Sequence, residues 1–404
     1  MIRSQECPVT HFDQLDRANL GGRWKQNWTV AAATCPVIRS DRYEPGGFFV
    51  LTKYRDVMYV LRHPDLFSSY PITIPPLEAR PRRMIPLETD PPKHRKYREP
   101  ITDYFSRSSQ ARWEPMYREA AAGLIEPIVG RGECDLAEEV CWAFPILAIM
   151  TMLGIDEAER ARVASGLSAM GHPPGGAIDP GRVAELARET AYALDHFRSL
   201  AQSRRAHPGD DLMSLLATVT VDGRPLDDNE IVDYAVNLCL GGFDTTASAL
   251  AYSFLFQSEN ADVRGRLVAD PSRIPDFIEE IMRFEQPSKG LARTVMAEVE
   301  LSGVTFSPGD RILLLFAAAN RDPDAFPEPN RFVLGRAPNR HLGFGAGPHV
   351  CVGIHMARLE MKVIFEEFLE RVPDFHVDPG SVVETPGPTF LVSAMPATWA
   401  RPGA

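Results

Sequence analysis

The chain has 404 residues, of which 44% are hydrophobic and 24% are charged, as is ordinary for a globular protein. A formal net charge of −11 argues against nucleic acid as a partner. No run of 18 apolar residues predicts a membrane span, the first ten residues lack the apolar core of a signal peptide, and the six cysteines form no CxxC pair. We therefore expect a cytoplasmic protein.

No linker, repeat or low-complexity block interrupts the chain, and we expect residues 1–404 to form one domain. Near the start, the apolar run at 48–51 follows two glycines and predicts a strand. A short helix is expected over 56–62, since a His-Pro step follows it. Residues 67–86 carry several prolines and arginines, including Arg82, and predict a long loop of the kind that is often functional.

The segment 90–98 reads Asp-Pro-Pro-Lys-His-Arg-Lys-Tyr-Arg. Its prolines favour a helix start, so His94 and Arg98 lie four residues apart on one helical face. Two cationic donors on one face suit the carboxylates of a buried anionic ligand. A solvated basic helix is the alternative that this segment alone leaves open.

The middle of the chain is predominantly helical in pattern over 110–206, with a Gly- and Pro-rich break at 171–181. Asp227 and Glu230 then have the spacing of a capping box, and about 30 residues of nearly all-round apolar helix follow. A helix that is apolar on all sides belongs in the interior of a large protein. We therefore expect 227–258 to be a buried central helix.

Within that helix, residues 241–246 read Gly-Gly-Phe-Asp-Thr-Thr. Glycine costs a helix interior about 1 kcal/mol relative to alanine, so some advantage should compensate. One interpretation is a functional site that uses Asp244 and Thr245. The alternative is a packing notch in which a threonine bonds the helix backbone.

Another helix is predicted over 275–287, with proline in its first turn and one apolar side. Glu280 and Arg283 lie three residues apart, close enough to pair. An exposed pair of this kind is worth little, typically under ~1 kcal/mol. Residues 293–315 then alternate as short strands around a Ser-Pro-Gly-Asp turn.

Residues 344–353 read Phe-Gly-Ala-Gly-Pro-His-Val-Cys-Val-Gly, and a helical pattern follows to about residue 371. Glycines let a backbone approach a flat ligand closely. A helix N-terminus favours a thiolate, so Cys351 should have a lowered pKa and suits the role of an axial iron ligand. Two alternatives are a structural buried cysteine and a zinc site, although paired short ligand spacings are missing. That zinc site would use His341, His349, Cys351 and His355.

This loop resembles the haem-binding signature of the cytochrome P450 family, Phe-Gly-x-Gly-x-His/Arg-x-Cys-x-Gly, at every fixed position. The segments at 90–98, 241–246 and 280–283 are similar to three further motifs in the family's order, closest to soluble bacterial members such as the camphor-hydroxylating one. The resemblance implies a mainly α fold with small β-sheets. Haem b would lie between the helix at 227–258 and the helix after Cys351.

The same resemblance implies a monooxygenase that oxidises a small, mostly apolar organic molecule with O2. Cys351 would be the axial ligand of the haem iron, and thiolate ligation favours O–O cleavage. Asp244 would relay protons, and Thr245 would donate a hydrogen bond in the oxygen-binding site. Thr246 would support these two residues. The other implied haem-binding residues are His94, Arg98, Arg293, Phe344 and His349.

Two further residue sets follow from the resemblance. Glu280, Arg283 and Arg331 should form a buried structural triad. The substrate pocket should draw on the loop at 70–86 and on Asn237, Leu240, Gly241, Lys289, Leu291, Thr389 and Phe390. The expected substrate is a compact terpenoid or aromatic molecule with one polar group, and a carboxylate is the sharper hypothesis because Lys289 or Arg82 would meet it.

No G-x-G-x-x-G motif follows a predicted strand, so electrons should come from a separate ferredoxin and its reductase. A basic patch would receive the ferredoxin, unless its charges are only a solvated face. That patch comprises Arg95, Lys96, Arg358 and Lys362. A peroxide-driven peroxygenase is one alternative function, although such enzymes typically lack the Asp-Thr pair. A non-catalytic haem-thiolate sensor or carrier is the other.

Overall fold

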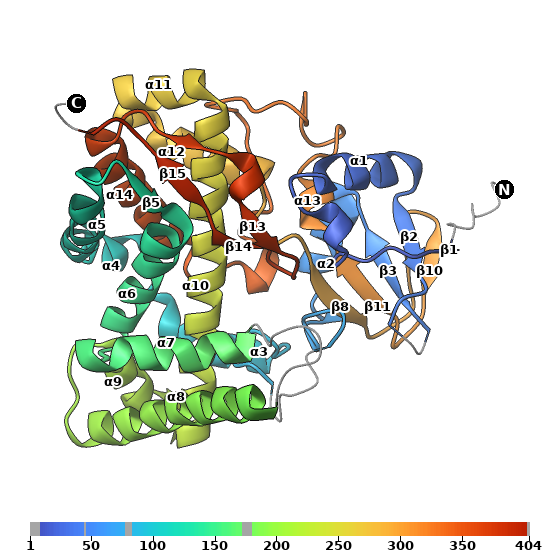
Figure 1. The fold of residues 1–404 in the computed structure, drawn as a ribbon. Coiled ribbons are helices and arrows are strands. Elements are labelled where there is room, and N and C mark those ends of the chain that lie inside the picture. Colours follow the sequence, from blue (N-terminus) through green and yellow to red (C-terminus); the bar gives the residue numbers. More distant parts are fainter. Residues whose placement is uncertain (1–8, 44–45, 77–82, 172–179, 402–404) are drawn as a thin grey trace.

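The computed structural model describes residues 9–43, 46–76, 83–171 and 180–401. The chain forms a large helical part beside a smaller part built on a sheet, with the first strands and α1 in the smaller part (Figure 1). The α-helices are α1 Trp24–Thr34, α2 Tyr54–Arg62, α3 Lys93–Thr102, α4 Arg107–Ala111, α5 Glu114–Val129, α6 Ala143–Met152, α7 Glu157–Gly171, α8 Pro180–Ala206, α9 Leu212–Thr218, α10 Asp228–Glu259, α11 Ala261–Ala269, α12 Ile274–Phe284, α13 Phe316–Ala319 and α14 Ile354–Arg371. The mainly α fold with small sheets is confirmed.

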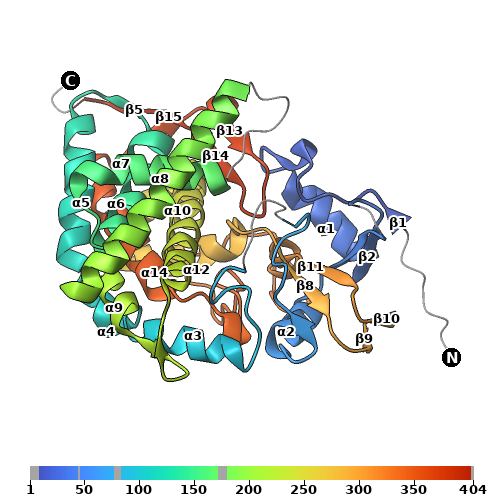
Figure 2. The same cartoon turned by 90° about the horizontal axis from the view of Figure 1, so that it is seen from below.

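The largest sheet has the order β1-β2-β3-β11-β8-β4. Its strands are β1 Val9–Thr10, β2 Val37–Ser40, β3 Phe48–Leu51, β4 Phe67–Ser68, β8 Leu291–Val295 and β11 Arg311–Leu314. The parallel pair β3–β11 joins the start of the chain to its last third, with Leu51 opposite Leu314. The sheet thereby fixes β8, which lies next to β11 in the sheet-based part (Figure 2).

The remaining strands make small sheets of two or three strands. They are β5 Glu133–Asp135, β6 Thr220–Val221, β7 Arg224–Pro225, β9 Val299–Leu301, β10 Val304–Phe306, β12 His376–Val377, β13 Val383–Thr385, β14 Leu391–Ala394 and β15 Pro396–Thr398. The strand predicted at 48–51 is confirmed as β3, and the helix predicted over 56–62 is α2, which begins two residues earlier. The predicted break at 171–181 lies almost entirely outside the described residues.

Helix α10 runs through the middle of the helical part (Figure 1). Asp227 accepts a hydrogen bond from the Glu230 N–H at 2.9 Å, and Glu230 accepts one from the Asp227 N–H at 2.9 Å, so the predicted capping box is confirmed. Most side chains beyond the first turn are buried on all sides of the helix. Burial of the side chains stabilises this helix and offsets the free-energy cost of its two internal glycines.

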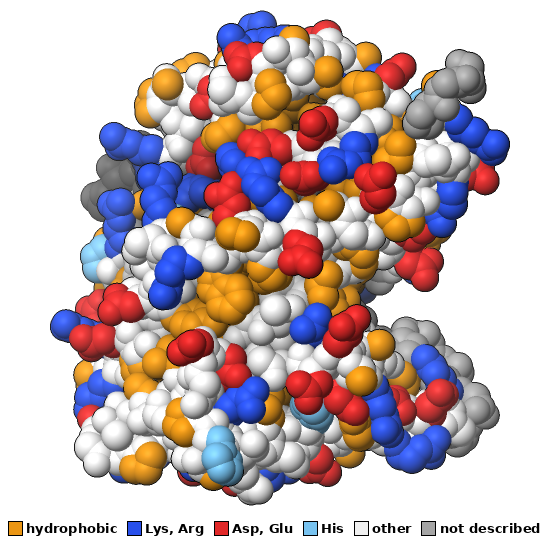
Figure 3. All heavy atoms as spheres, turned by 90° about the vertical axis from the view of Figure 1, so that its left-hand side faces the viewer, with side chains coloured by type: hydrophobic (Ala, Val, Ile, Leu, Met, Phe, Trp, Pro, Cys, Tyr) orange, Lys and Arg blue, Asp and Glu red, His pale blue; other side chains and the backbone are white. Residues whose placement is uncertain are grey.

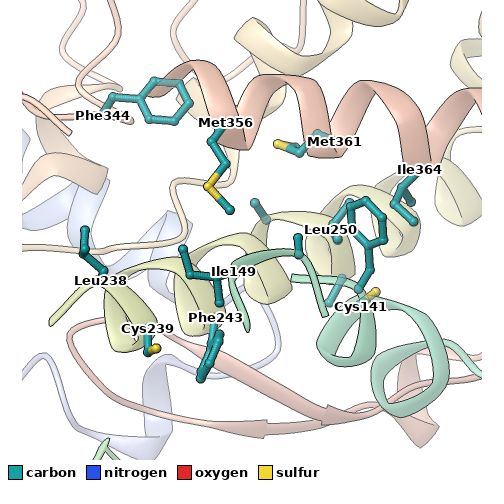
Figure 4. Close-up of a cluster of buried hydrophobic side chains, with 14 of the residues drawn as sticks. Cys141, Ile149, Leu238, Cys239, Phe243, Leu250, Phe344, Met356, Met361 and Ile364 are labelled. Atoms are coloured by element: carbon teal, nitrogen blue, oxygen red, sulfur yellow. The ribbon is translucent and has the colours of Figure 1, made fainter. Parts of the chain in front are cut away.

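Helix α14 packs alongside α10, and aromatic rings seal the contact. Phe254 of α10 lies with its ring centroid 5.4 Å from Phe365 and 4.9 Å from Phe368 of α14. Figure 4 shows the other end of this interface, where Met356 points from α14 toward α10 within the buried cluster that also includes Ile149 and Leu238. Because the cysteine loop directly precedes α14, this packing fixes the position of the loop relative to α10.

Helix α12 ends at Phe284, three residues before the predicted end, because Gln286 takes a positive φ of 41° ahead of Pro287. Among the described residues, no single helix is long and apolar enough to cross a membrane. The bent pair Ala137–Met152 and Glu157–Ser168 passes that test jointly, by length and composition only.

Candidate active site

A cavity of about 310 Å³ lies between α10 and the loop that precedes α14. From α10 it is lined by Asn237, Leu238, Gly241, Gly242, Thr245, Thr246 and Ala249, and from the opposite side by Phe344, Gly345, His349, Cys351, Met356 and Glu360. Helix α3 adds His94 and Arg98, and β8 adds Leu291 and Arg293. Motifs scattered over 260 residues of sequence therefore meet around one space.

The cysteine loop has one backbone shape that its neighbours enforce. Gly347 has φ +69°, and a Cβ there would lie 2.1 Å from the carbonyl oxygen of Leu61 at the end of α2. Only glycine fits this position without moving backbone. The Cys351 N–H donates to the Phe344 carbonyl at 2.9 Å and closes the loop. The exposed surface of Cys351 faces the cavity that it lines.

The pKa of Cys351 is raised above its ordinary value, because burial removes the thiol from water. The Gly353 N–H, Arg98 and Arg358 oppose that shift without reversing it. The lowered pKa expected from the helix N-terminus is therefore wrong for this thiol. Loss of hydration outweighs the helix dipole here, so a positively charged group bound to the sulfur would be needed to hold it as a thiolate.

Four cationic or imidazole side chains gather where α3, β8 and the cysteine loop meet. The rings of His94 and His349 stack with centroids 3.9 Å apart. Arg98 donates to the Val350 carbonyl at 2.8 Å, and Arg293 donates to the Ala292 carbonyl at 2.7 Å. Within the described part of the chain, none of the four forms an ion pair with a carboxylate.

Burial lowers the pKa of each of these groups: to about 4 for His94, about 2 for His349 and about 10 for Arg293, with a decrease for Arg98 as well. Their mutual repulsion adds to the effect for the two histidines. Buried cations without a counter-charge are costly. An anionic ligand that lies in the cavity would remove that cost.

A flat ligand with two carboxylates and a thiophilic metal matches this donor set. The carboxylates would meet Arg98 and Arg293, and Cys351 would bind the metal. Haem b has these features. Gly345 and Gly347, both with positive φ, carry no side chains, so the backbone of the cysteine loop could approach such a flat ligand closely. The residues present therefore fit haem b. No group of three metal-binding side chains occurs among the described residues, so the zinc alternative finds no support.

On the opposite wall, the Thr245 hydroxyl donates to the Gly241 carbonyl at 2.7 Å, which satisfies the helix-backbone bond expected of a packing notch. Thr245 nevertheless lines the cavity. Asp244 does not line it, and burial raises the pKa of its carboxyl to about 7. A carboxyl with a pKa near neutrality both gives and accepts a proton readily.

Sequence reasoning missed Glu360 of α14. This side chain is 1% exposed, lines the cavity and bonds with Thr246, while its Oε1 has no hydrogen-bond partner among the described residues. Burial raises the pKa of Glu360 far above its ordinary value. The available signal was its spacing, because Met356 and Ile364, four residues to either side, are buried on the same face.

The predicted substrate-pocket residues divide into two groups. Asn237, Gly241, Leu291 and Thr389 line the cavity, together with Pro86 of the predicted loop. Leu240, Lys289 and Phe390 do not line it. Lys289 is instead enclosed by aromatic rings behind the cavity wall, so it cannot receive a substrate carboxylate, and Arg82 lies outside the described residues.

The predicted triad around Glu280 needs one correction. Arg283 donates to both Glu280 oxygens, at 2.9 and 2.8 Å, and both side chains are fully buried. Arg331 pairs instead with Glu328 on the surface, where its side chain is 69% exposed. Arg336, with a side chain only 7% exposed, takes the third place. Arg331 contributes only its backbone carbonyl, which accepts from Arg283 at 3.1 Å.

Most cations of the predicted basic patch are already paired. Arg358 donates to Glu279 at 2.6 and 2.7 Å, Lys362 lies 3.1 Å from Glu366, and Lys96 lies 2.5 Å from Asp222. Arg95 is exposed. Figure 3 shows the side of the molecule that carries α5, where basic and acidic side chains alternate. A partner that docked on this side would meet a mixed surface rather than charges of one sign.

The sequence model of the family Cytochrome P450 matches residues 274–399. Cytochrome P450-terp of Pseudomonas sp is 34% identical over 374 residues, which cover 87% of this chain and 85% of that protein. The methyl-branched lipid omega-hydroxylase of Mycobacterium tuberculosis is also 34% identical over 374 residues, covering 87% of this chain and 84% of that protein.

Solved structures agree with these sequence matches. The crystal structure of CYP101J2 has a TM-score of 0.87 at 26% identity, covering 99% of this chain and 100% of that one. A mutant of P450 EryK in complex with erythromycin B has a TM-score of 0.84 at 27% identity, covering 95% and 98%. The chain therefore belongs to the cytochrome P450 family, and it is a haem b monooxygenase that oxidises a small organic molecule with O2.

Proposed function

We propose that residues 1–404 form one catalytic domain in which Cys351 is the axial thiolate ligand of the haem iron. The observation that carries this assignment is the cavity itself, which has Cys351 on one side and Gly241 and Thr245 of α10 on the other. Phe344 lines the same space and would lie against the haem. Bound iron would supply the positive charge that stabilises the buried thiolate.

The haem carboxylates would be held at the cationic end of the cavity. Arg98 and Arg293 are the strong donors, since both keep their charge at neutral pH. His94 and His349 have pKa values of about 4 and about 2, so they are neutral there and would act as hydrogen-bond donors rather than as charges.

When bound, the haem supplies the activation of O2 and the oxidation of substrate. The protein's part is to seat the substrate, exclude water and move protons. Asp244, with a pKa of about 7, is partly protonated at neutral pH and would take protons up from outside the cavity. Thr245 would pass them inward by turning its hydroxyl from the Gly241 carbonyl toward the cavity. Thr246 would support this step through Glu360.

The substrate would be a compact, mostly apolar molecule of terpenoid or aromatic type with one polar group. The cavity wall is largely apolar, and Asn237 and Thr389 offer polar atoms. The Asn237 amide N–H donates to the Ile85 carbonyl at 3.3 Å, which leaves its oxygen as an acceptor. Relatives named as a methyl-branched lipid omega-hydroxylase and a steroid C26-monooxygenase support an apolar substrate.

Electrons would come from a ferredoxin and its reductase in the cytoplasm. The docking face would include Arg95, Lys96, Arg358 and Lys362, of which the last three already have acidic neighbours. The bound ferredoxin would have to compete with Asp222, Glu279 and Glu366 for these cations. Such a face predicts a weak, salt-sensitive complex.

The decisive experiment compares wild type with Cys351→Ala. Reduced wild type with carbon monoxide should give the red-shifted Soret band of thiolate-ligated haem, and the variant should lose it. If the variant keeps the band, another residue ligates the iron. Turnover with a surrogate ferredoxin and reductase separates the enzyme from a haem-thiolate sensor, and turnover with hydrogen peroxide alone would identify a peroxygenase.

A further inference from the structure

Lys289 is a buried lysine that lies outside the cavity. It is fully buried, and its ammonium donates to the Glu285 carbonyl at 2.6 Å. The ammonium lies 4.0, 5.0 and 5.1 Å from the ring centroids of Trp24, Tyr252 and Phe390. These rings come from α1, α10 and the residue before β14. Cation–π contacts from three sides compensate in part for the loss of water.

The backbone of Lys289 connects the same region. Its N–H donates to the Pro388 carbonyl at 2.8 Å, and its carbonyl accepts from the Ala317 N–H of α13 at 3.1 Å. The Phe390 N–H donates to the Pro287 carbonyl at 3.4 Å. The segment 287–289 is therefore joined to 388–390 on both sides of one isolated bridge, between Ser288 and Thr389.

Pro287, Ser288 and Thr389 of these two segments line the cavity, and of the three only Ser288 and Thr389 carry hydroxyls. Their hydroxyl oxygens are 3.1 Å apart, so one hydroxyl donates to the other. Two hydroxyls carry two protons, and their mutual bond uses only one. The pair therefore keeps one O–H donor and several lone pairs for a ligand. Lys289 directly follows Ser288 in the chain. Phe390, whose ring contacts the Lys289 ammonium, directly follows Thr389.

The charged groups around Lys289 are already engaged elsewhere. The Glu285 carboxylate pairs with Lys25 at 2.6 Å, and Glu384 accepts the Tyr252 hydroxyl at 2.6 Å. Arg321 lies 5.2 Å from the Trp24 ring and donates to the Phe284 carbonyl at 2.8 Å. Lys289 forms no ion pair with a carboxylate in the described part of the chain. Its contacts are with rings and backbone, which suits a group that fixes geometry.

We propose that Lys289 is a positioning residue that holds the Ser288–Thr389 hydroxyl pair toward the substrate, and that the pair binds a hydroxyl or carbonyl group of that substrate. This inference rests on the proposed function in that it takes the cavity as the substrate site. A neutral group is favoured because the ionisable side chains that line the cavity lie at the haem-binding end or, for Glu360, on α14.

The test is a spectral binding titration of haem-loaded protein with two probes of matched shape, 1-adamantanol and 1-methyladamantane. The affinity for 1-adamantanol should fall by about 3- to 10-fold in each of the variants Ser288→Ala, Thr389→Val and Lys289→Met, as expected for the loss of one hydrogen bond. All three variants should change the affinity for 1-methyladamantane by less than about 2-fold. The double variant with Lys289→Met and Ser288→Ala should bind 1-adamantanol no more weakly than either single variant, because both substitutions remove the same contact.

Lys25→Met is the matched control, because it removes a neighbouring lysine that contacts Glu285 but not the hydroxyl pair. It should leave both titrations unchanged. Hydrogen exchange gives a readout that needs no ligand: Lys289→Met should speed exchange of the Lys289 and Phe390 amides, and Lys25→Met should not. If Lys289→Met does not fold, Lys289→Gln, which keeps a donor for the Glu285 carbonyl, takes its place.

Three results would overturn the proposal: equal losses for both probes, additive losses in the double variant, or unchanged exchange in Lys289→Met. Failure of wild type to prefer 1-adamantanol would contradict the assignment of the hydroxyl pair. A protein that shows the thiolate Soret band yet gives any of these results contradicts the positioning role alone. The proposed function would stand.

Discussion

Arg336 donates its Nε–H to both carboxylate oxygens of Glu280, at 3.0 and 3.1 Å. Arg283 occupies the other side of the same carboxylate, so one buried anion serves two guanidinium groups. The carbonyls of Pro327 and Arg331 accept further N–H groups of Arg336. This cluster ties α12 to the segment that leads into the cysteine loop.

Removing Arg336 should therefore destabilise the protein. Arg336→Ala leaves part of a buried carboxylate unpaired, which typically costs about 3–5 kcal/mol. Arg331→Ala removes a surface pair and should cost under ~1 kcal/mol. Urea unfolding of the haem-loaded protein measures both. Equal midpoints for the two variants would mean that Arg331 has the larger structural role after all.

Arg98→Leu should weaken haem retention. Loss of one charge-assisted hydrogen bond to a haem carboxylate corresponds to about 1.5–3 kcal/mol, or roughly 10- to 100-fold faster haem loss. Arg95→Leu is the control, because Arg95 lies three residues earlier on α3 and is exposed. Transfer of haem to an apoglobin acceptor measures the rate. Equal rates in the two variants would contradict the assignment of Arg98.

Thr245→Ala should uncouple electron flow from product formation. The variant keeps the cavity but loses the hydroxyl that would carry protons inward, so reduced nicotinamide consumed through the redox partners should yield several-fold more hydrogen peroxide. Thr245→Ser retains the hydroxyl and should stay near wild type. The ratio of peroxide to reduced nicotinamide is the measurement. Unchanged coupling in Thr245→Ala would reduce this residue to a packing role, as its bond to the Gly241 carbonyl also permits.

Asp244→Asn should lower kcat by roughly 100-fold or more while changing substrate affinity by less than about 3-fold, because a proton relay acts after the substrate is seated. The wild-type carboxyl, with a pKa of about 7, should also give kcat an inflection near that pH. The variant should lack the inflection. A parallel loss of affinity would point instead to a collapsed pocket.

Glu360→Gln should remove a pH dependence of stability. In the folded protein burial raises the pKa of Glu360 far above its ordinary value, so the unfolded chain releases this proton first as pH rises. The group thus lowers stability progressively above pH ~4.5, and over that range Glu360→Gln should gain stability relative to wild type. Thermal midpoints between pH 5 and 8 measure this difference. A constant difference across the range would mean that Glu360 is ionised when folded.

Local sequence signals predicted the parts of the site that short segments encode. The cysteine loop and the capping box at Asp227 depend on backbone geometry within ten residues, and the structure has both where the sequence places them. His94 and Arg98 share a face of α3, but only the fold brings Arg293 of β8 beside them. That meeting could not be read from spacing, since it depends on the pairing of β8 with β11.

The errors arise where an interaction depends on distant chain. Arg331 and Arg336 both follow the Glu-x-x-Arg segment at a similar distance, and only the turn between them decides which one reaches Glu280. Lys289 sits beside a cavity-lining residue, but its orientation depends on Trp24 and Tyr252. The pKa of Cys351 depends on burial, which helix position alone does not give.

The pairing of β3 with β11 has a consequence for how the chain is made. During synthesis, residues 48–51 leave the ribosome about 260 residues before their partner, 311–314, exists. Until then β2 and β3 present an unpaired apolar edge, the kind of surface that associates with other chains. The sheet therefore cannot be completed until helices α3 to α12 have been made, whereas α14 and β12–β15 follow β11 in the chain. Slow translation or a shortage of chaperones should harm this protein's yield chiefly through aggregation of its first 60 residues.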